Sequence, residues 1–191
     1  QCRSFWIMFD FPPLHQWTAA VASSAAHLFR PRVAYRMRYR GDPVSDAGNS
    51  TSAPQSPEPG AMIDYYFAHA PTGRFTLDVL DAGGRVIRSF ASDSAAARGN
   101  DAANDAADED APRRRFAPPA LPRHAGINRF IWDLRYPGPR QTATRPPMGR
   151  GPMAVPGSYS VRLTVAASGG GAAWSETQPL VVKEDPRVTR D

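Results

Sequence analysis

Hydrophobic and polar residues alternate most regularly between residues 156 and 165, which read Pro-Gly-Ser-Tyr-Ser-Val-Arg-Leu-Thr-Val. Tyr159, Val161, Leu163 and Val165 fall on one side and polar residues on the other, which is the period of two of a half-buried β-strand. The Pro-Gly pair in front predicts a turn into this strand. A sheet with one apolar face needs a second layer to cover that face, so this strand predicts a β-sandwich or a barrel.

Other short segments carry the same kind of pattern, at residues 61–67, 74–80, 85–90, 126–136 and 174–182. The sequence Asp81-Ala82-Gly83-Gly84 predicts a hairpin turn, since glycine accepts positive φ without steric cost. Between residues 61 and 183 the patterns predict six or seven short strands and no helix. They favour an all-β fold, an immunoglobulin-like or fibronectin-III-like sandwich with an extended N-terminal arm and long irregular loops.

The inward positions of these strands define a predicted core. Its members are Phe75, Leu77, Val79, Phe130, Trp132, Leu134, Tyr159, Val161 and Leu163. Trp132 is expected at the centre, because its strand places several large aromatic residues on one face. Tyr159 follows the Pro-Gly turn, where a tyrosine corner would direct its hydroxyl back to the backbone of the preceding loop. Pro179 favours an edge position or a bulge, because it has no N–H to donate.

Residues 1–40 predict an N-terminal arm with a strand and a short helix. Residues 4–10 form an aromatic run that Pro12 and Pro13 end. Thr18 can cap a short helix within residues 18–29 that carries Val21, Ala25 and Leu28 on one side. Residues 32–38 alternate again and predict a strand with Val33, Tyr35 and Met37 on one face and arginines on the outer face.

Four further stretches have little to bury. Residues 41–60 predict a flexible linker, residues 137–155 an extended Pro-rich and Gly-rich loop, and residues 184–191 a polar tail. Residues 91–123 are a low-complexity insertion in the sandwich, in which alanines and acidic residues precede three arginines. This insertion is either a charged docking loop or a disordered surface insertion, and its composition favours the second.

The chain of 191 residues has a net charge of +5, and Lys183 is the single lysine among 23 basic residues. The arginines could form a surface for nucleic acid or anionic lipid. Their scatter along the chain favours instead the compositional bias of a GC-rich genome.

No apolar run reaches the roughly 20 residues that span a bilayer. No signal peptide is visible, which suggests a mature or truncated product, and the lone Cys2 cannot form an internal disulfide.

Residue types that carry catalysis or bind metal do not form a recognisable motif. His15, His27, His69 and His124 do not stand at metal-ligand spacing, and we expect each of them to be a surface or loop residue. Asp64, Asp78 and Asp133 fall within predicted strands and are interpreted as strand-face charges that pair with arginines such as Arg135 or Arg162. Tyr65, Tyr66, Trp17 and Trp174 could stack on sugars, but burial in the core is the favoured interpretation. The sequence therefore predicts no catalytic residue, no cofactor and no metal site.

Several strings resemble a known family. Arg-Ser-Phe-Trp-Ile at residues 3–7, Pro-Leu-His-Gln at 13–16 and Ala-His-Leu-Phe at 26–29 followed by Pro31 resemble the last propeller strand and exit segment of bacterial sortilin-like, BNR-repeat β-propeller proteins, often labelled glycosyl hydrolases. Residues 60–66, 80–88, 125–136 and 156–163 resemble the module that follows that propeller. The resemblance implies a secreted or periplasmic protein with an Ig-like C-terminal module. It does not imply hydrolase activity, because the propeller with its Asp-box repeats is not in this sequence.

Together these observations predict a non-catalytic structural or binding subunit, not an enzyme. It would dock onto other protein subunits of a larger periplasmic or membrane-associated envelope assembly through its aromatic arm and Pro-rich loops. The predicted partner-binding residues are Phe5, Trp6, Phe9, Phe11 and Trp17. An alternative is an accessory carbohydrate-binding module of a BNR-repeat glycosyl hydrolase-like protein. Nucleic-acid binding is disfavoured, and contact with a membrane is expected to be peripheral at most.

Overall fold

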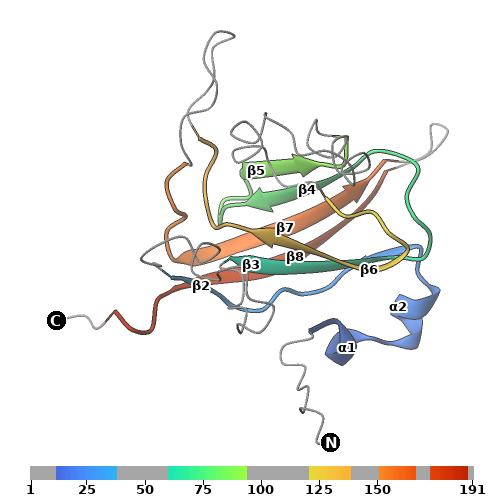
Figure 1. The fold of residues 1–191 in the computed structure, drawn as a ribbon, viewed down its shortest axis with the longest axis horizontal. Coiled ribbons are helices and arrows are strands. Elements are labelled where there is room, and N and C mark those ends of the chain that lie inside the picture. Colours follow the sequence, from blue (N-terminus) through green and yellow to red (C-terminus); the bar gives the residue numbers. More distant parts are fainter. Residues whose placement is uncertain (1–11, 38–59, 94–120, 139–150, 167–172, 189–191) are drawn as a thin grey trace, which may run out of the picture.

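The computed structural model describes residues 12–37, 60–93, 121–138, 151–166 and 173–188 (Figure 1). Two short helices, α1 (Pro12–Gln16) and α2 (Ala19–Ser23), precede the strands. The strands are β1 (Ala26–Leu28), β2 (Ala34–Arg36), β3 (Ala61–Phe67), β4 (Phe75–Leu80), β5 (Val86–Ala91), β6 (Gly126–Trp132), β7 (Gly157–Val165) and β8 (Trp174–Glu184).

The strands form two sheets, as the all-β prediction requires. Sheet A has three strands in the order β1-β3-β6, and sheet B has five in the order β2-β8-β7-β4-β5. All neighbouring pairs are antiparallel except β2 and β8, which are parallel. In Figure 1, β3 and β6 of sheet A lie in front of the strands of sheet B.

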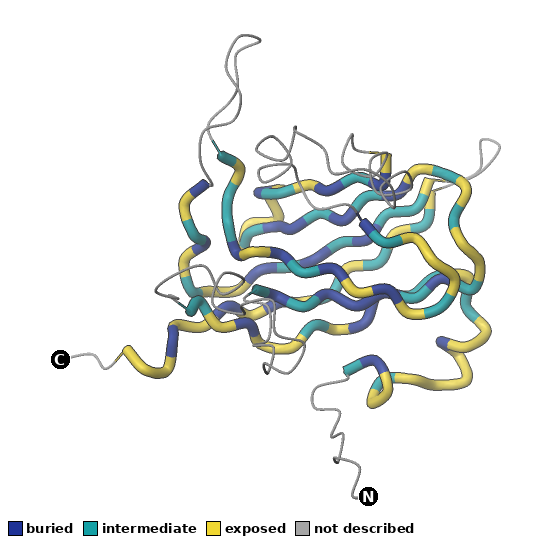
Figure 2. The backbone as a smooth tube through the Cα atoms, viewed as in Figure 1, coloured by how far each residue is buried: buried dark blue, intermediate teal, exposed yellow. Residues whose placement is uncertain are grey.

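The core lies between the two sheets and is rich in aromatic contacts. Phe67 of β3 meets Phe75 of β4 at a ring-centroid distance of 5.2 Å, and Phe90 of β5 meets Phe130 of β6 at 4.6 Å. Buried positions alternate mainly with positions of intermediate burial along the central strands β4 and β7 (Figure 2). All nine side chains predicted for the core are buried, and Trp132 is fully so: Phe75, Leu77, Val79, Phe130, Trp132, Leu134, Tyr159, Val161 and Leu163.

Tyr159 forms the predicted corner contact. Its hydroxyl donates a hydrogen bond to the backbone carbonyl of Val155 at 2.7 Å, and its ring packs against Trp132. Burial of the ring and the neighbouring Tyr136 side chain raise the pKa of Tyr159 to about 12. The strand prediction for this region is also confirmed, because β7 pairs with β4 on one side and β8 on the other.

The predicted hairpin is confirmed as β4 and β5. Gly84 adopts φ +79°, and the Asp81 carboxylate accepts hydrogen bonds from the backbone N–H groups of Gly83 and Arg85. The hydrogen bond from the Arg85 N–H, followed by that from Gly83 and the charge of Arg85, lowers the pKa of Asp81. Local turn chemistry therefore accounts for this connection.

The predicted helix within residues 18–29 is wrong beyond its first turn. Thr18 caps α2 as expected, with its hydroxyl accepting a hydrogen bond from the N–H of Val21, but α2 ends at Ser23. Leu28 lies in β1, where it pairs with Tyr65 of β3. The backbone hydrogen bonds of a strand at the edge of sheet A outweigh the helix propensity of this Ala-rich stretch, because differences in propensity are small beside tertiary contacts.

The predicted orientation of the strand within residues 32–38 is also wrong. Ala34 is 5% exposed and faces the core, whereas Val33 and Tyr35 are 41% and 42% exposed. The reason is the register with β8, in which Ala34 lies beside the buried Val182. Packing against a neighbouring strand, rather than side-chain hydrophobicity, sets which face of this short strand points inward.

Two predicted strands differ in extent from the observed ones. The strand predicted at residues 126–136 ends at Trp132, and Leu134 adopts φ +55° yet remains buried. The last strand continues to Glu184, beyond the predicted end. The edge prediction for Pro179 is confirmed, because Pro179 pairs with Ser160 of β7 on one side while β2 pairs only with residues 182–184 on the other.

Some predictions lie outside the described residues. These are the strand at residues 4–10, the linker up to residue 59, the insertion at residues 94–120 and residues 139–150 of the Pro-rich loop.

Candidate interaction surface

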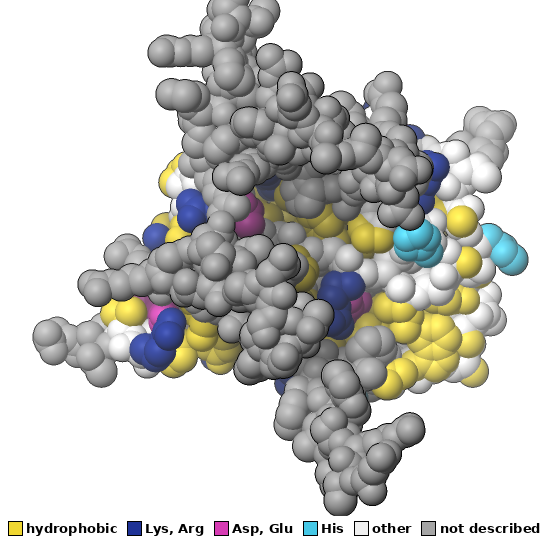
Figure 3. All heavy atoms as spheres, in the orientation of Figure 1, with side chains coloured by type: hydrophobic (Ala, Val, Ile, Leu, Met, Phe, Trp, Pro, Cys, Tyr) yellow, Lys and Arg dark blue, Asp and Glu magenta, His cyan; other side chains and the backbone are white. Residues whose placement is uncertain are grey.

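The outer face of sheet A carries side chains that a water-facing sheet would not usually present. Alternation along β3 and β6 directs six residues away from the core, and we call them the sheet A surface. They are Met62, Asp64 and Tyr66 of β3 with their register partners Ile131, Arg129 and Ile127 of β6. Four of the six are apolar or aromatic. In Figure 3, hydrophobic side chains gather on the lower right of this face, beside a basic and an acidic side chain near its centre.

The charged pair in the sheet A surface is Asp64 and Arg129. The Nε and NH2 groups of Arg129 donate to the two carboxylate oxygens of Asp64 at 2.7 and 3.0 Å. The side chain of Asp64 is only 3% exposed, against 36% for Arg129. A bidentate partner of this kind compensates for the loss of water around a buried carboxylate. The carboxylate of Asp64 is therefore shielded from water although it lies on the outer face of sheet A.

Asp64, Asp78 and Asp133 were interpreted as strand-face charges that pair with arginines. The structure confirms this pairing for Asp78, and for Asp64 it shows a partner that the sequence analysis did not name. Asp78 pairs with Arg162 at 3.1 Å on the outer face of sheet B. Asp133 lies just after β6 and accepts a hydrogen bond from the backbone N–H of Arg135. Sequence reasoning did not identify Arg129 as the partner of Asp64. Register alone could have revealed it, because both residues lie at the middle of their strands.

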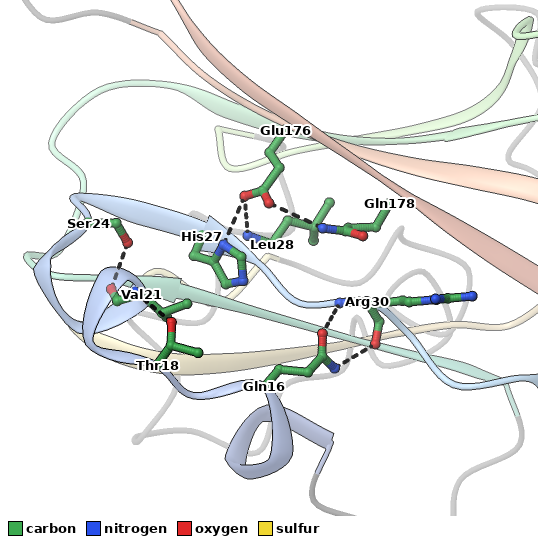
Figure 4. A network of polar contacts seen from close by, with 9 residues as sticks. All are labelled: Gln16, Thr18, Val21, Ser24, His27, Leu28, Arg30, Glu176 and Gln178. Carbon is green, nitrogen blue, oxygen red and sulfur yellow. Dashed lines mark hydrogen bonds and ion pairs between the residues drawn. The ribbon is translucent and has the colours of Figure 1, made fainter.

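Trp17 extends the apolar area beyond the strands. Its ring lies edge-on to Tyr66 at 5.1 Å and stacks near Phe29 at 6.3 Å, yet 40% of the residue is exposed. Gln16 holds this segment in place, because its side-chain amide exchanges two hydrogen bonds with the backbone of Arg30 at 3.0 and 2.9 Å (Figure 4). Of the five predicted partner-binding residues, Trp17 is thus positioned beside the sheet A surface.

The other four predicted partner-binding residues, Phe5, Trp6, Phe9 and Phe11, lie outside the described residues. They precede α1 directly in the chain.

The outer face of sheet B is different in composition. Along β7, Ser158, Ser160, Arg162 and Thr164 point outward, opposite the buried residues of the same strand. Ile127 of sheet A, in contrast, is 36% exposed, and Leu14 of the adjoining α1 is 62% exposed. Away from Tyr35 and Val181, which are also exposed, the outer face of sheet B is therefore more polar than the sheet A surface.

A polar cluster connects the two sheets at the side of the molecule where β1 meets β8 (Figure 4). Glu176 of β8 accepts hydrogen bonds from the backbone N–H of Leu28 at 2.8 Å and from the Gln178 amide at 3.2 Å. His27 Nδ1 lies 3.2 Å from the same carboxylate. This cluster is a structural link, because it satisfies an edge N–H of sheet A with a side chain of sheet B.

We expected each histidine to be a surface or loop residue. This prediction is wrong only for His27, which lies half-buried in β1, whereas His15, His69 and His124 are exposed. Among the residues that the structure describes, no three metal-ligating side chains come together.

The four aromatic residues considered for stacking on sugars differ in how far they are exposed. Tyr65 is fully buried, its hydroxyl donates to the carbonyl of Pro122 at 2.6 Å, and burial raises the pKa of Tyr65 well above its usual range. It therefore belongs to the core, as the favoured interpretation held. Tyr66 and Trp174 are half-buried, and Trp17 is the most exposed of the four.

Comparison with known proteins gives no relative: no family model, curated protein or solved structure matches this chain. No helix in the described part of the chain is long and apolar enough to cross a membrane.

Proposed function

We propose that this chain is a non-catalytic, immunoglobulin-like binding module that docks onto a larger protein assembly of the bacterial envelope. The docking surface comprises the sheet A surface, Trp17 and the aromatic arm in front of it, with the Pro-rich loops as further contacts. The observation that carries the proposal is the apolar outer face of sheet A beside a partly exposed Trp17. The periplasmic or extracellular location rests on the family resemblance.

The strand order supports the immunoglobulin-like part of the proposal. If β1 is strand A and β2 is strand A′, then sheet A reads A-B-E and sheet B reads A′-G-F-C-C′, an order of the immunoglobulin type. On this assignment Tyr159 stands near the start of strand F, where a tyrosine corner belongs, and its bond to Val155 has the expected form. This agreement concerns connectivity and one diagnostic contact.

The roles of the charged clusters support a non-catalytic module. Asp64 is paired with Arg129, Asp78 with Arg162, and Glu176 with the edge of β1. Each cluster links two strands and satisfies its own hydrogen bonds. Groups engaged in this way serve the fold, since a catalytic acid or base must reach a substrate atom.

Energetics favour the sheet A surface as a binding site. A tryptophan at the middle of an interface is among the residues whose removal costs most binding free energy. Burial of exposed apolar area provides about 25 cal/mol per Å², and the Asp64–Arg129 pair is already desolvated on the Asp64 side. A partner would thus gain apolar contact here without having to dehydrate a free carboxylate. The matching partner surface is apolar and aromatic.

Site-specific photo-crosslinking in the native host tests this proposal. A photoreactive phenylalanine analogue would be placed at Trp17 or Ile127, with Ser175 and Thr177 on the outer face of sheet B as matched exposed controls. We expect the first two positions to give the same discrete adduct of higher mass and the controls to give none. Trp17→Ala should reduce the adduct formed from position 127. An identical adduct pattern at all four positions, or no adduct at Trp17 and Ile127, would contradict the proposal.

A further inference from the structure

A second surface stands apart from the sheet A surface, at the end of sheet B where β2 meets the C-terminal part of β8. There the structure has an open groove of about 690 Å³. It is lined by Tyr35, Pro156, Lys183, Glu184, Pro186 and Val188, among others. The lining combines apolar, aromatic and charged groups within one concave area.

Exposed apolar side chains concentrate at this groove. Five of the nine large apolar side chains that the described residues expose lie in it or within two residues of its lining: Val33 (41%), Tyr35 (42%), Val155 (60%), Val181 (38%) and Val188 (61%). The rest of the outer face of sheet B carries mostly Ser, Thr and charged residues. A local gathering of exposed apolar residues on a polar face marks an interaction site.

The register explains how Tyr35 and Lys183 come together. They are direct partners in the parallel pair of β2 and β8, so their side chains lie on the same face about 5 Å apart at the backbone. The inverted orientation of β2 is what brings Tyr35 to this outer face. Gly157, at the start of the neighbouring β7, pairs with Val182 and also lines the groove, where an added Cβ would meet nothing within 4 Å.

The groove also carries charged side chains, and its one ammonium group is that of Lys183. The side chain of Lys183, the single lysine of the chain, makes no hydrogen bond or ion pair with the residues that the structure describes, whereas Glu184 and Asp185 in the same lining both have partners. The nearby Asp185 is neutralised by Arg187, whose NH2 and Nε groups lie 2.7 and 2.9 Å from its carboxylate. A ligand for this groove is therefore expected to bring a negative charge to Lys183.

The neighbouring strand suggests the shape of the ligand. β2 is the terminal strand of sheet B within the described residues, and it is only three residues long. An extended peptide beside such a strand can add backbone hydrogen bonds while alternate side chains fill apolar pockets. We propose that this groove binds an extended segment of a partner protein, with alternating apolar side chains and a carboxylate that pairs with Lys183. This site is separate from the sheet A surface and does not depend on the proposed envelope function.

Selection from a displayed library of random decapeptides tests the inference on the full chain. We expect the enriched peptides to alternate apolar residues and to contain Asp or Glu. Their affinity, measured by fluorescence anisotropy, should fall at least roughly tenfold in Lys183→Glu, since the charge-assisted contact is lost and a like charge takes its place. Tyr35→Ser should weaken binding similarly, and a new selection against Lys183→Glu should enrich basic peptides.

Ile127→Ser, on the sheet A surface, is the matched control and should leave peptide affinity unchanged. The inference is overturned if no peptide is enriched, if the enriched peptides lack acidic residues, or if they bind Lys183→Glu and Tyr35→Ser as well as the unaltered chain. It is also overturned if anionic phospholipid vesicles or an oligouronate bind in a Lys183-dependent manner while peptides do not. Loss of the crosslinks at Trp17 would leave this result unaffected, so the two proposals fail separately.

Discussion

The guanidinium of Arg129 in β6 holds the carboxylate of Asp64 in β3 by two hydrogen bonds, although both side chains point away from the core between the two sheets. Asp64 is nevertheless almost fully buried. A water-facing pair of this kind usually contributes little to stability, whereas a buried carboxylate depends strongly on its partner. The burial of Asp64 therefore makes this pair a test of how dry the sheet A surface is.

Arg129→Met should destabilise the fold by about 2–3 kcal/mol. This loss is smaller than the loss expected when a fully buried pair is broken, because Arg129 is partly exposed. The reason is that Asp64 would remain buried without its partner. The double variant Asp64→Leu with Arg129→Met should recover most of that loss, because it leaves no buried charge. Urea unfolding of the single and double variants measures both effects. Equal free energies of unfolding for Arg129→Met and the unaltered chain would show that water reaches Asp64.

Tyr159→Phe should cost about 1 kcal/mol, the usual net value of one hydrogen bond. The ring stays in place against Trp132, while the carbonyl of Val155 loses its donor. Thermal or urea unfolding measures the loss. Tyr35→Phe, at an exposed tyrosine, is the matched control and should be neutral within error. A neutral Tyr159→Phe would mean that the corner contact does not stabilise the fold.

The raised pKa of Tyr159 predicts a loss of stability at alkaline pH. Folding raises this pKa from 10.0 to about 12, so the folded state favours the neutral phenol. The resulting contribution is fully present below pH 10 and is lost as the pH rises from 10 to about 12. Tyr159→Phe should therefore have a shallower decline of unfolding free energy over that interval. Part of the decline should persist in the variant, because burial also raises the pKa of Tyr65. Parallel curves for the two proteins would refute the assignment.

Gly60→Ala should destabilise the fold more than Gly84→Ala. Both glycines have positive φ, +151° and +79°. A Cβ at Gly60 would clash with the backbone carbonyl oxygen of Trp132, whereas a Cβ at Gly84 would meet nothing within 4 Å. We expect a loss of about 1 kcal/mol at Gly84, from backbone conformation alone, and a larger loss at Gly60. Melting temperatures of the two variants provide the comparison, and the reverse order would contradict the close approach of Gly60 to β6.

Glu176→Ala should loosen β1 locally. The N–H of Leu28 would lose its acceptor, and we expect its amide to exchange with solvent about ten times faster, as for the loss of one charge-assisted hydrogen bond. Glu176→Gln keeps an acceptor oxygen and should have a smaller effect. Hydrogen exchange measured by NMR separates the two. The amides of the β4–β5 hairpin serve as the internal control, and equal acceleration there would indicate global destabilisation.

The regular strands were predictable because their local pattern and their burial agree. Leu77, Val161 and Leu163 alternate with polar residues and all face the core, and the turn at Gly84 has the backbone conformation that its glycine predicts. The corner contact of Tyr159 was also predictable, since it depends on residues only four apart in the chain.

The candidate surfaces were predictable only in part. Trp17 was predicted as a contact residue from its arm, but its neighbour Tyr66 lies far away in sequence. The groove beside Tyr35 escaped prediction, because alternation indicated that Tyr35 faced inward. Short strands and isolated helical turns carry too few residues for their pattern to outweigh their neighbours.

The sequence by itself determined an all-β chain with a hairpin at residues 81–84 and a core that includes Trp132 and Tyr159. Those features depend on side-chain alternation and turn chemistry, which act over a few residues. Only the tertiary structure decided that Leu28 lies in a strand, that Ala34 faces the core and that Asp64 meets Arg129. The physical reason is the register of strand pairing. Hydrogen bonds to a strand distant in the sequence determine which side chains point to the core, and a shift by one residue would exchange the buried and the exposed side chains of that strand.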